Sequence, residues 1–266
     1  MKISHPNAYW NGQPPENVFL VTDDMGAQIS SGYVVYQYYP HLYPDRPVNI
    51  FFQAEGERSG QYMLFGALIA RARQLRDQNP GEQARIYTCV DPKNQALIDF
   101  YAHSGMNCSE REIAMRLAIP EGQVQVPAGC STELTPLYMP EQQMAFLDRM
   151  QRNDVSQVDA TFLVQLMRTE HFHAVGLFSA GQLAGEILVA GNGPQAELVA
   201  FYISQPFRRR GLGTAMCRWA LWTLSLEGVQ VAGARFVTRS LPQKALCKAL
   251  GASETATTAV FPQLFM

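Results

Sequence analysis

The feature that most constrains the fold is a succession of strand and helix patterns that occurs twice along the chain. Each half contains a strand, a long apolar helix, a second strand, a short helix that ends in glycine, and a closing strand. When Gly105 is aligned with Gly251, at an offset of 146 residues, the other elements of the halves follow in the same order. Such a repeat is typical of two copies of one α/β unit, so the sequence predicts a mixed α/β fold in two tandem domains.

Hydrophobic periodicity places the individual elements. Apolar residues at helical spacing predict helices over 62–75, 93–104, 140–152, 158–168, 212–227 and 242–250. Runs rich in β-branched and aromatic residues predict strands over 48–53, 86–90, 173–178, 182–190, 197–204, 234–238 and 257–261. Residues 119–132 contain two prolines and two glycines and little amphipathic pattern, which indicates a linker. We therefore expect one domain over 1–120 and a second over 131–266.

Charge and cysteine content exclude several function classes. The 266 residues carry 21 Lys and Arg against 23 Asp and Glu, so the formal net charge of −2 provides no general attraction for nucleic acid or an anionic membrane. No window approaches about 18 consecutive apolar residues, and the first residues lack the apolar core of a signal peptide. Five scattered cysteines without a CxxC pair argue against a disulfide framework. We expect a cytoplasmic protein that binds neither nucleic acid nor membranes.

The close histidine pair, His171 and His173, has no further ligand type at suitable spacing except Glu170. A zinc site in a protein is built from three or four such ligands. We interpret the pair as polar residues that flank a strand, and we expect no metal ion.

The most informative segment is 197–214, in which a strand is followed by the turn QPFRRRGLGT and then by a long helix. The first backbone N–H groups of a helix lack intrahelical partners and carry partial positive charge, so an anion binds there readily. Gly211 and Gly213 permit a pyrophosphate to approach the backbone closely, and positive charge is added by Arg208, Arg209 and Arg210. The segment predicts a site for a phosphorylated cofactor.

Two common phosphate-binding patterns do not fit this segment. A GxGxxG fingerprint requires a third glycine where this chain has Met216, and the sequence contains no GxxxxGK followed by Ser or Thr. What remains is RxxGxG, formed by Arg208, Gly211 and Gly213 after a strand that begins at Glu197. With its preceding strand and following helix, this string resembles the acyl-CoA-binding motif of the GNAT superfamily of acyltransferases.

The resemblance implies a complete GNAT fold over about 131–266 and acyl-CoA, in the first place acetyl-CoA, as co-substrate. Backbone groups of Phe201, Tyr202 and Ile203 would pair with the pantetheine arm, and one of their N–H groups would be the oxyanion donor. The remaining contacts with the co-substrate would come from Arg208, Arg209, Arg210, Gly211, Leu212, Gly213, Thr214 and Ser240.

Residues 17–118 resemble a shortened GNAT domain without the two early helices. The clearest match to the family's NxxAxxxYxxxGF pattern is formed by Asn94, Phe100, Tyr101 and Gly105. The segment 51–66, however, has only Arg58 and Gly60 as fragments of RxxGxG. We therefore expect a degenerate N-terminal copy.

In the second half the motif is intact, but Ser240 and Cys247 occupy the family's usual Asn and Tyr positions. In the family, the Tyr often protonates the departing CoA thiolate. A thiol is able to donate a proton in this way, so Cys247 is a candidate catalytic residue. The alternative is that Cys247 is a small buried hydrophobic residue.

Glu197 is the first candidate for acid–base catalysis. It stands eleven residues before Arg208, a spacing similar to that of the general-base glutamate in GNAT members that acetylate amines. An alkylamine with a pKa near 10.4 must lose a proton before it attacks, and a buried carboxylate with a raised pKa would accept it. The alternative is a solvated residue at the strand start. Glu186 is a second acidic candidate, for binding a cationic substrate.

Two functions are compatible with these observations. The first is an N-acyltransferase, in the first place an N-acetyltransferase, that transfers the acyl group to the amine of a small molecule or peptide by direct attack in a ternary complex. The second is a non-catalytic acyl-CoA-binding sensor or regulatory module. The missing Tyr and the degenerate first half favour this alternative. The sequence specifies neither the acceptor nor an oligomeric state.

Overall fold

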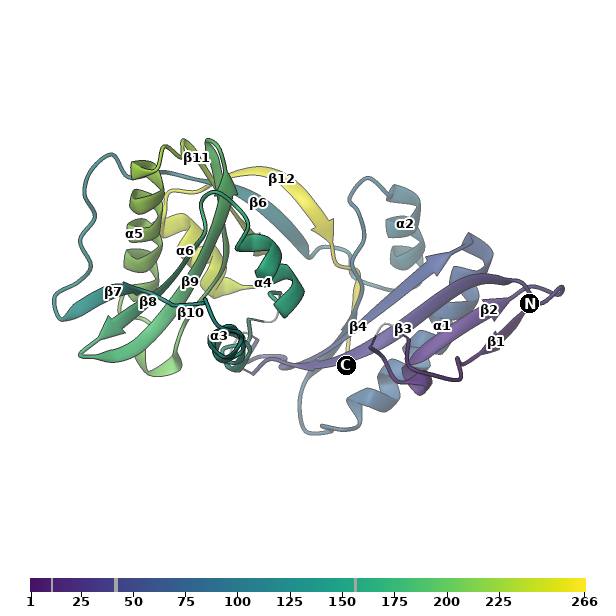
Figure 1. Ribbon diagram of the computed structural model, residues 1–266. Helices are drawn as coiled ribbons and strands as arrows, with labels where there is room; N and C mark the ends of the chain where they lie inside the picture. Colours follow the sequence, from purple (N-terminus) through teal and green to yellow (C-terminus); the bar gives the residue numbers. More distant parts are fainter. Residues whose placement is uncertain (11, 41–42, 156) are drawn as a thin grey trace. The chain divides into compact units, whose positions relative to one another are not determined.

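The computed structural model describes residues 1–10, 12–40, 43–155 and 157–266, which form two compact units (Figure 1). The first unit comprises Met1–Arg111 and Ala259–Met266, and the second comprises Glu112–Thr258. Each unit contains one β-sheet with parallel and antiparallel strand pairs, and helices that pack on it. The predicted mixed α/β fold is confirmed.

The sheet of the first unit has six strands in the order β1-β2-β3-β4-β5-β13. They are β1 (Lys2–Ser4), β2 (Val18–Thr22), β3 (Gln28–Tyr38), β4 (Val48–Gly56), β5 (Ala84–Tyr87) and β13 (Gln263–Phe265). β4 and β5 are parallel, and the other neighbours are antiparallel. Helix α1 (Arg58–Arg76) buries Leu64, Leu68 and Ala72 at helical spacing against the sheet, and α2 (Gln95–His103) completes this core through Tyr101.

The sheet of the second unit has seven strands in the order β12-β6-β11-β10-β9-β8-β7. They are β12 (Ser253–Val260), β6 (Arg111–Leu117), β11 (Val231–Val237), β10 (Gln195–Ile203), β9 (Gln182–Asn192), β8 (His173–Ser179) and β7 (Cys130–Leu134). β10 and β11 are parallel, whereas β9 pairs with β10 in antiparallel fashion through a bulge between Leu198 and Ala200. The bulge reverses which residues of β10 face each side of the sheet.

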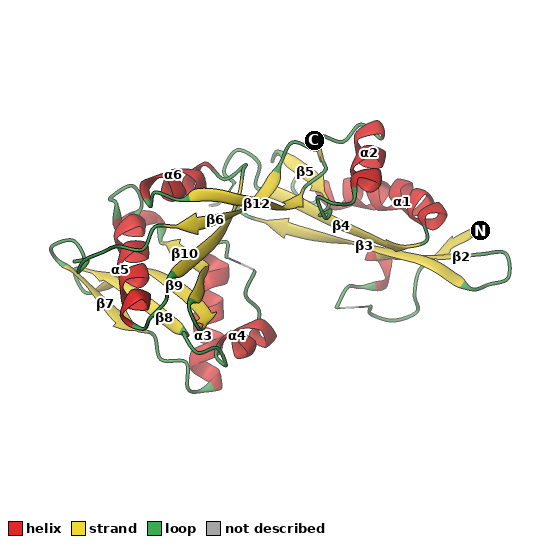
Figure 2. Cartoon of the chain, turned by 90° about the horizontal axis from the view of Figure 1, so that it is seen from above, coloured by secondary structure: helices red, strands yellow, loops and turns green. Residues whose placement is uncertain are grey.

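Two pairs of helices cover opposite sides of this second sheet (Figures 1 and 2). α5 (Leu212–Leu226) and α6 (Leu241–Ala249) share a core with one face of the sheet, to which Ile187 and Leu198 belong. α3 (Pro140–Arg152) and α4 (Ala160–Leu166) share a core with the other face, to which Leu188 and Ala200 belong. Within the described residues, no helix has the length and apolar character that a membrane crossing requires.

The boundaries of the units differ from the predicted domains 1–120 and 131–266. Strand β6 pairs with β11 and therefore belongs to the sheet of the second unit, although it precedes the predicted linker 119–132. Strand β13, from the end of the chain, pairs with β5 in the first unit. The difference has a physical reason, since each sheet is completed by a strand from the other half of the sequence.

Polar side chains explain where three short helices begin. Asn94 accepts a hydrogen bond from the Leu97 N–H at the start of α2, and Asp159 accepts one from Phe162 at the start of α4. At α6 the Ser240 hydroxyl accepts from the Gln243 N–H. These contacts satisfy N–H groups that have no intrahelical partner. Helix α5 has no side chain of this kind at its start, where Gly211 occupies the cap position.

Candidate active site

The start of α5 presents unpaired backbone donors behind a glycine turn. Gly211 caps the helix with φ +76°, and Arg209 also has a positive φ of +61°, which a non-glycine residue rarely adopts. The first backbone bond of the helix runs from the Ala215 N–H to the Gly211 carbonyl. The N–H groups of Leu212, Gly213 and Thr214 lie ahead of it and have no intrahelical acceptor. The start of α5 thus offers the kind of backbone donors that an anion site requires.

Both glycines leave the approach to these donors open. A Cβ on Gly211 would meet no atom within 4 Å, and one on Gly213 would meet Ile203 Cγ1 at an ordinary 3.5 Å. The glycines are therefore not required by packing against the rest of the protein. Leu212 is different, because its side chain is buried in the core of the unit and only its backbone is available to a ligand. The geometry fits a group such as a pyrophosphate, which takes hydrogen bonds from the main chain.

The three arginines of the turn have different positions. Arg208 is directed at the strand end, where its Nε donates to the Ile203 carbonyl at 2.7 Å. The Arg210 guanidinium lies 5.8 Å from the centre of the Phe207 ring. Arg209 and Arg210 are exposed. We infer that Arg208 holds the turn against the strand, while Arg209 and Arg210 provide the positive charge at the surface.

β10 separates from β11 on the way to this turn. The two strands pair only from Gln195–Val231 to Leu198–Ala234, after which β10 continues to Ile203 beside β9 alone. The Ser204 N–H donates to the Ala184 carbonyl of β9. Because alternate residues of a strand direct their backbone groups to opposite sides, Phe201 and Ile203 direct theirs toward the opening between β10 and β11. The predicted backbone contacts for a pantetheine arm are thus left without a strand partner at Phe201 and at the Ile203 N–H, while the Ile203 carbonyl accepts from Arg208.

The side chain and the backbone groups of Tyr202 point away from the opening between β10 and β11. Its side chain is 4% exposed, belongs to the core under α3 and α4, and its hydroxyl donates to Glu186 at 2.6 Å. By the same alternation, its backbone groups face β9. The geometry therefore favours Phe201 and Ile203 over Tyr202 as cofactor contacts.

Glu197 lies on β10 before the bulge, on the face opposite α5. Its carboxylate accepts from Arg235 Nε at 3.1 Å, and its side chain is 39% exposed. Glu197 is therefore only partly buried, in contrast to the buried carboxylate that the sequence predicted. Sequence reasoning missed Arg235, whose proximity follows from the parallel register of β10 and β11 and not from any local motif.

Cys247 and Ser240 are both buried within the fold. Cys247 is 8% exposed within the core that α6 shares with α5, and burial raises the pKa of its thiol. This placement agrees with the interpretation as a buried core residue and speaks against the predicted role as proton donor to a thiolate. Ser240 is 1% exposed, and its hydroxyl caps α6. Ser240 thus serves the start of α6, and Cys247 serves the packing of the core.

Glu186 is a buried ion-pair partner. It is 1% exposed and receives two hydrogen bonds from Arg149 of α3, both at 2.8 Å, besides the one from Tyr202. Thr135 donates to the same carboxylate at 3.3 Å. Because these donors occupy the carboxylate, Glu186 links α3 to β9 and is a poor candidate for binding a cationic substrate.

The histidine pair shares one carboxylate. His171 Nδ1 lies 3.0 Å and His173 Nε2 lies 2.7 Å from the two oxygens of Glu227, which follows α5. His171 Nε2 lies 2.8 Å from the Gly193 carbonyl, so both ring nitrogens of His171 face acceptors and only the protonated ring satisfies both. Among the described residues, no group of three or more His, Cys, Asp or Glu side chains is arranged to hold a metal ion.

This cluster makes part of the stability depend on pH. Burial alone would lower the pKa of His171, but the Gly193 carbonyl and the Glu227 and Glu170 carboxylates outweigh it and raise the pKa above 6.5. Burial would raise the pKa of Glu227, but His173 and His171 outweigh it and lower the pKa below 4.5. The raised His171 pKa stabilises the fold below pH 6.5, and this contribution is lost as pH rises through the folded value. The lowered Glu227 pKa stabilises above pH 4.5, and this contribution is lost at lower pH.

We therefore expect Glu227→Gln to lower the melting temperature most between pH 4.5 and 6.5, and progressively less as the pH rises through the raised pKa of His171. Thermal unfolding of both proteins across this range measures the difference. Glu254→Gln, at an exposed position of β12, serves as the control and should show no such trend. A difference that is constant across pH would contradict the assignment of a charged His171.

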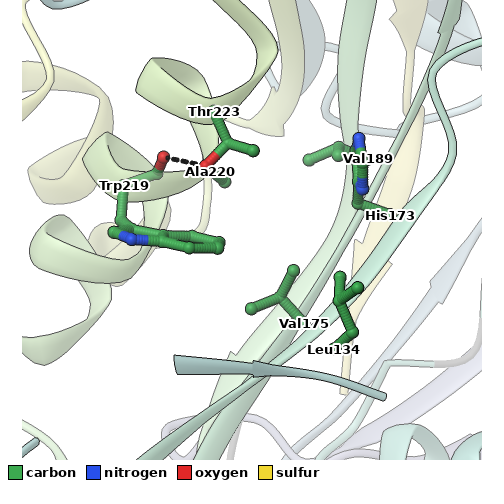
Figure 3. Close-up of a pocket in the computed structure, with 7 residues that line it drawn as sticks. All are labelled: Leu134, His173, Val175, Val189, Trp219, Ala220 and Thr223. Carbon is green, nitrogen blue, oxygen red and sulfur yellow. Dashed lines mark hydrogen bonds between the residues drawn. The ribbon is translucent and has the colours of Figure 1, made fainter. Parts of the chain in front are cut away.

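A small pocket lies between α5 and the β7–β9 side of the sheet, and His173 forms part of its lining. Figure 3 shows its lining, formed by Leu134, His173, Val175, Val189, Trp219, Ala220 and Thr223. None of these residues was predicted to bind the co-substrate. The free volume of about 10 Å³ accommodates at most one water molecule, so the pocket is a packing void of the α5 core.

The start of α1 in the first unit is built differently from that of α5. Its cap position holds Glu57, whose carbonyl accepts from the Ser30 hydroxyl at 2.9 Å. Gly60 is buried, and a Cβ there would collide with the Ser30 side chain. The glycine thus serves the packing of β3 against α1. A carboxylate at the cap position also repels an anionic ligand.

Comparison with protein families identifies the second unit. Residues 132–245 match the model of the acetyltransferase (GNAT) family, and this range includes the whole segment 197–214. The resemblance predicted from RxxGxG is thereby confirmed for this part of the chain. No curated protein sequence matches the chain.

Solved structures extend the likeness in fold beyond this range. A GCN5-related N-acetyltransferase from Sphaerobacter thermophilus has 12% identity and a TM-score of 0.52, with 96% of this chain and 83% of that chain covered. A probable N-acyltransferase from Enterococcus faecalis V583 has 10% identity and a TM-score of 0.58, with 92% and 61% covered. A tandem GNAT protein from the clavulanic acid biosynthesis pathway has 18% identity and a TM-score of 0.48, with 93% and 82% covered.

Proposed function

We propose that this chain, an acyltransferase whose second unit carries a GNAT acetyltransferase domain, transfers the acetyl group of acetyl-CoA to the amine of a small molecule or peptide. The observation that carries the proposal is the combination of open backbone donors at the start of α5 with the opening between β10 and β11. The backbone donors suit a pyrophosphate, and the opening suits an extended pantetheine arm. Such a protein would act in the cytoplasm, where acetyl-CoA is available.

Different residues of β10 and of the turn that follows it would hold different parts of acetyl-CoA. Arg209, Arg210 and the N–H groups of Gly211, Leu212, Gly213 and Thr214 would hold the phosphates. The backbone groups of Phe201 and the N–H of Ile203 would align the arm, and one N–H at the opening would polarise the thioester carbonyl. Acetyl-CoA supplies the activated acyl group. Direct attack within a ternary complex then needs an acceptor that has lost its proton.

Glu197 is the proposed base for that proton. It stands on the strand that leads into the cofactor turn, and its partial exposure leaves it accessible to an acceptor and to water. A water molecule between the amine and Glu197 would transfer the proton from the amine to the Glu197 carboxylate. With Cys247 in the core, the departing thiolate would take its proton from solvent or from the acceptor ammonium.

The first unit is proposed to be a degenerate copy that does not bind acetyl-CoA. Glu57 at the start of α1 and the close packing of Gly60 against Ser30 support this, because both oppose a phosphate at that helix. The regulatory alternative would have the second unit bind acetyl-CoA without turnover. Its support is the absence of the family's Tyr at position 247.

Release of free thiol from acetyl-CoA, measured against a broad panel of amines, tests the proposal. We expect acceptor-dependent release with at least one class of amine, together with an acetylated product of the expected mass. If acetyl-CoA raises the melting temperature but no amine supports release, the sensor function is correct and the transferase proposal is wrong. A parallel reaction without acceptor measures hydrolysis of the thioester.

A further inference from the structure

We propose that the acceptor carries a carboxylate close to its amine, as an amino acid does, and that Arg235 of β11 binds this carboxylate. The inference deepens the proposed function and rests on it, because it places the amine beside Glu197. It concerns residues of the second unit only, and neither the cofactor motif nor the match to the family determines it.

The first observation is the face of the sheet on which these residues lie. Alternate residues of β6 and β11, among them Met115 and Phe236, are buried in the core with α5 and α6, as is Leu198 of β10. The intervening residues Arg116, Arg235 and Glu197 therefore project from the opposite face. The core under α3 and α4 draws on β8, β9 and the later part of β10, so it does not include β6 or β11. Arg116 and Arg235 are exposed accordingly.

The second observation is the ion pair that Arg235 forms. Its Nε lies 3.1 Å from Glu197 Oε1, and the side chains are 57% and 39% exposed. An ion pair this exposed contributes little to stability, so its partners are free to exchange for charges of a ligand. In an amino acid the ammonium and carboxylate groups are also roughly 3 Å apart. Such a molecule pairs with both partners at once, with its ammonium on Glu197 and its carboxylate on Arg235.

The third observation is a glycine between two further charges. In the register of the sheet, Glu197 lies opposite Gly233, and Gly233 lies opposite Arg116. Strands are about 4.8 Å apart, so Arg116 stands roughly 10 Å from Glu197 with no side chain between them. An acceptor at Glu197 therefore meets two guanidinium groups and one carboxylate. A simple cationic amine is repelled by this excess of positive charge, whereas an acceptor with its own carboxylate compensates it.

Arg235 is thus assigned a positioning and specificity role. The competing explanation is a cross-strand ion pair that serves only the sheet. The two explanations differ in a measurable way. Loss of a structural pair affects stability and all acceptors equally, while loss of a carboxylate-binding arginine affects acceptors that have the carboxylate more strongly than those that lack it.

The experiment compares amino acids with their carboxamides as acceptors, because each pair has nearly the same shape and differs in the charge. For the unaltered protein we expect a kcat/KM at least about tenfold higher for the amino acids, as befits a charge-assisted hydrogen bond to a carboxylate. Arg235→Gln should remove this preference, because kcat/KM for the amino acids should fall at least about tenfold further than kcat/KM for the carboxamides. Arg235→Lys should restore part of the preference, since the charge remains.

Arg73→Gln, at an exposed position of α1 in the first unit, is the matched control and should keep the full preference. Equal kcat/KM for both acceptor types in the unaltered protein, or a preference that survives Arg235→Gln, would overturn the inference while N-acyl transfer stands. If no amine of either type is acetylated although acetyl-CoA binds, the proposed function fails and the acceptor proposal fails with it.

Discussion

Gly213→Asp should abolish acetyl-CoA binding without destabilising the protein. Gly213 lies in the first turn of α5, where an acidic residue improves the helix through its dipole and aspartate replaces the poor helix former glycine. A Cβ at this position meets no atom closer than 3.5 Å. The same carboxylate would stand where the proposed pyrophosphate accepts backbone hydrogen bonds, and would repel it. Stability and binding are therefore expected to change in opposite directions.

Thermal unfolding with and without acetyl-CoA measures both effects. At about 100 times its dissociation constant the ligand adds about 2.7 kcal/mol to the unaltered protein, equivalent to a rise of roughly 5 to 10 °C in melting temperature. For Gly213→Asp we expect no rise, and a melting temperature without ligand at least as high as that of the unaltered protein.

Gly228→Ala is the matched control, because Gly228 follows the opposite end of the same helix and has φ +89°. Alanine is strained there, so this variant should melt earlier yet retain the full rise with acetyl-CoA. A rise that persists in Gly213→Asp would show that the cofactor site has been placed wrongly.

Glu197→Gln should lower kcat/KM for amine acceptors by about 100-fold or more, the usual contribution of a general base. Glutamine keeps the shape of the side chain and accepts no proton. Since Glu197 lies near the start of β10 and the phosphate-binding turn follows its other end, the rise in melting temperature with acetyl-CoA should be unchanged. Initial rates of thiol release with one amine, measured across pH, report the loss.

Glu133→Gln, at an exposed position of β7, is the control and should leave the rates unchanged. A decrease of less than about threefold for Glu197→Gln would support the interpretation of Glu197 as a solvated residue. It would also remove the basis for placing the acceptor amine beside it.

Local patterns predicted much of the second unit. The periodicity over 140–152 and 212–227 corresponds to α3 and to α5, which ends at Leu226. The cofactor turn was also identified from sequence, because one continuous segment supplies its strand, glycines and arginines. Interactions of this kind are local, and the sequence displays them directly.

Features that depend on distant residues were not predictable. Strand β3 was missed because its buried face carries Ser30, Gly32 and Val34, and two of these residues interrupt a hydrophobic alternation. The small residues follow from tertiary packing, since a Cβ on Gly32 would meet Leu68 of α1 at 3.1 Å. Arg235 was likewise missed, because only the register of β10 and β11 brings it to Glu197.

Because β6 and β13 each pair with a strand from the other half of the sequence, neither sheet can be completed before the other half has been synthesised. During translation the first sheet must wait for residues 263–265 before β5 gains its antiparallel neighbour. Meanwhile β6 leaves the ribosome more than a hundred residues ahead of its partner β11. Nascent chains therefore expose unpaired strand edges until residues 263–265 have been made, a period in which chaperones bind and aggregation competes with folding. Neither half of the sequence therefore forms a complete domain that can be excised or transferred to another protein by itself.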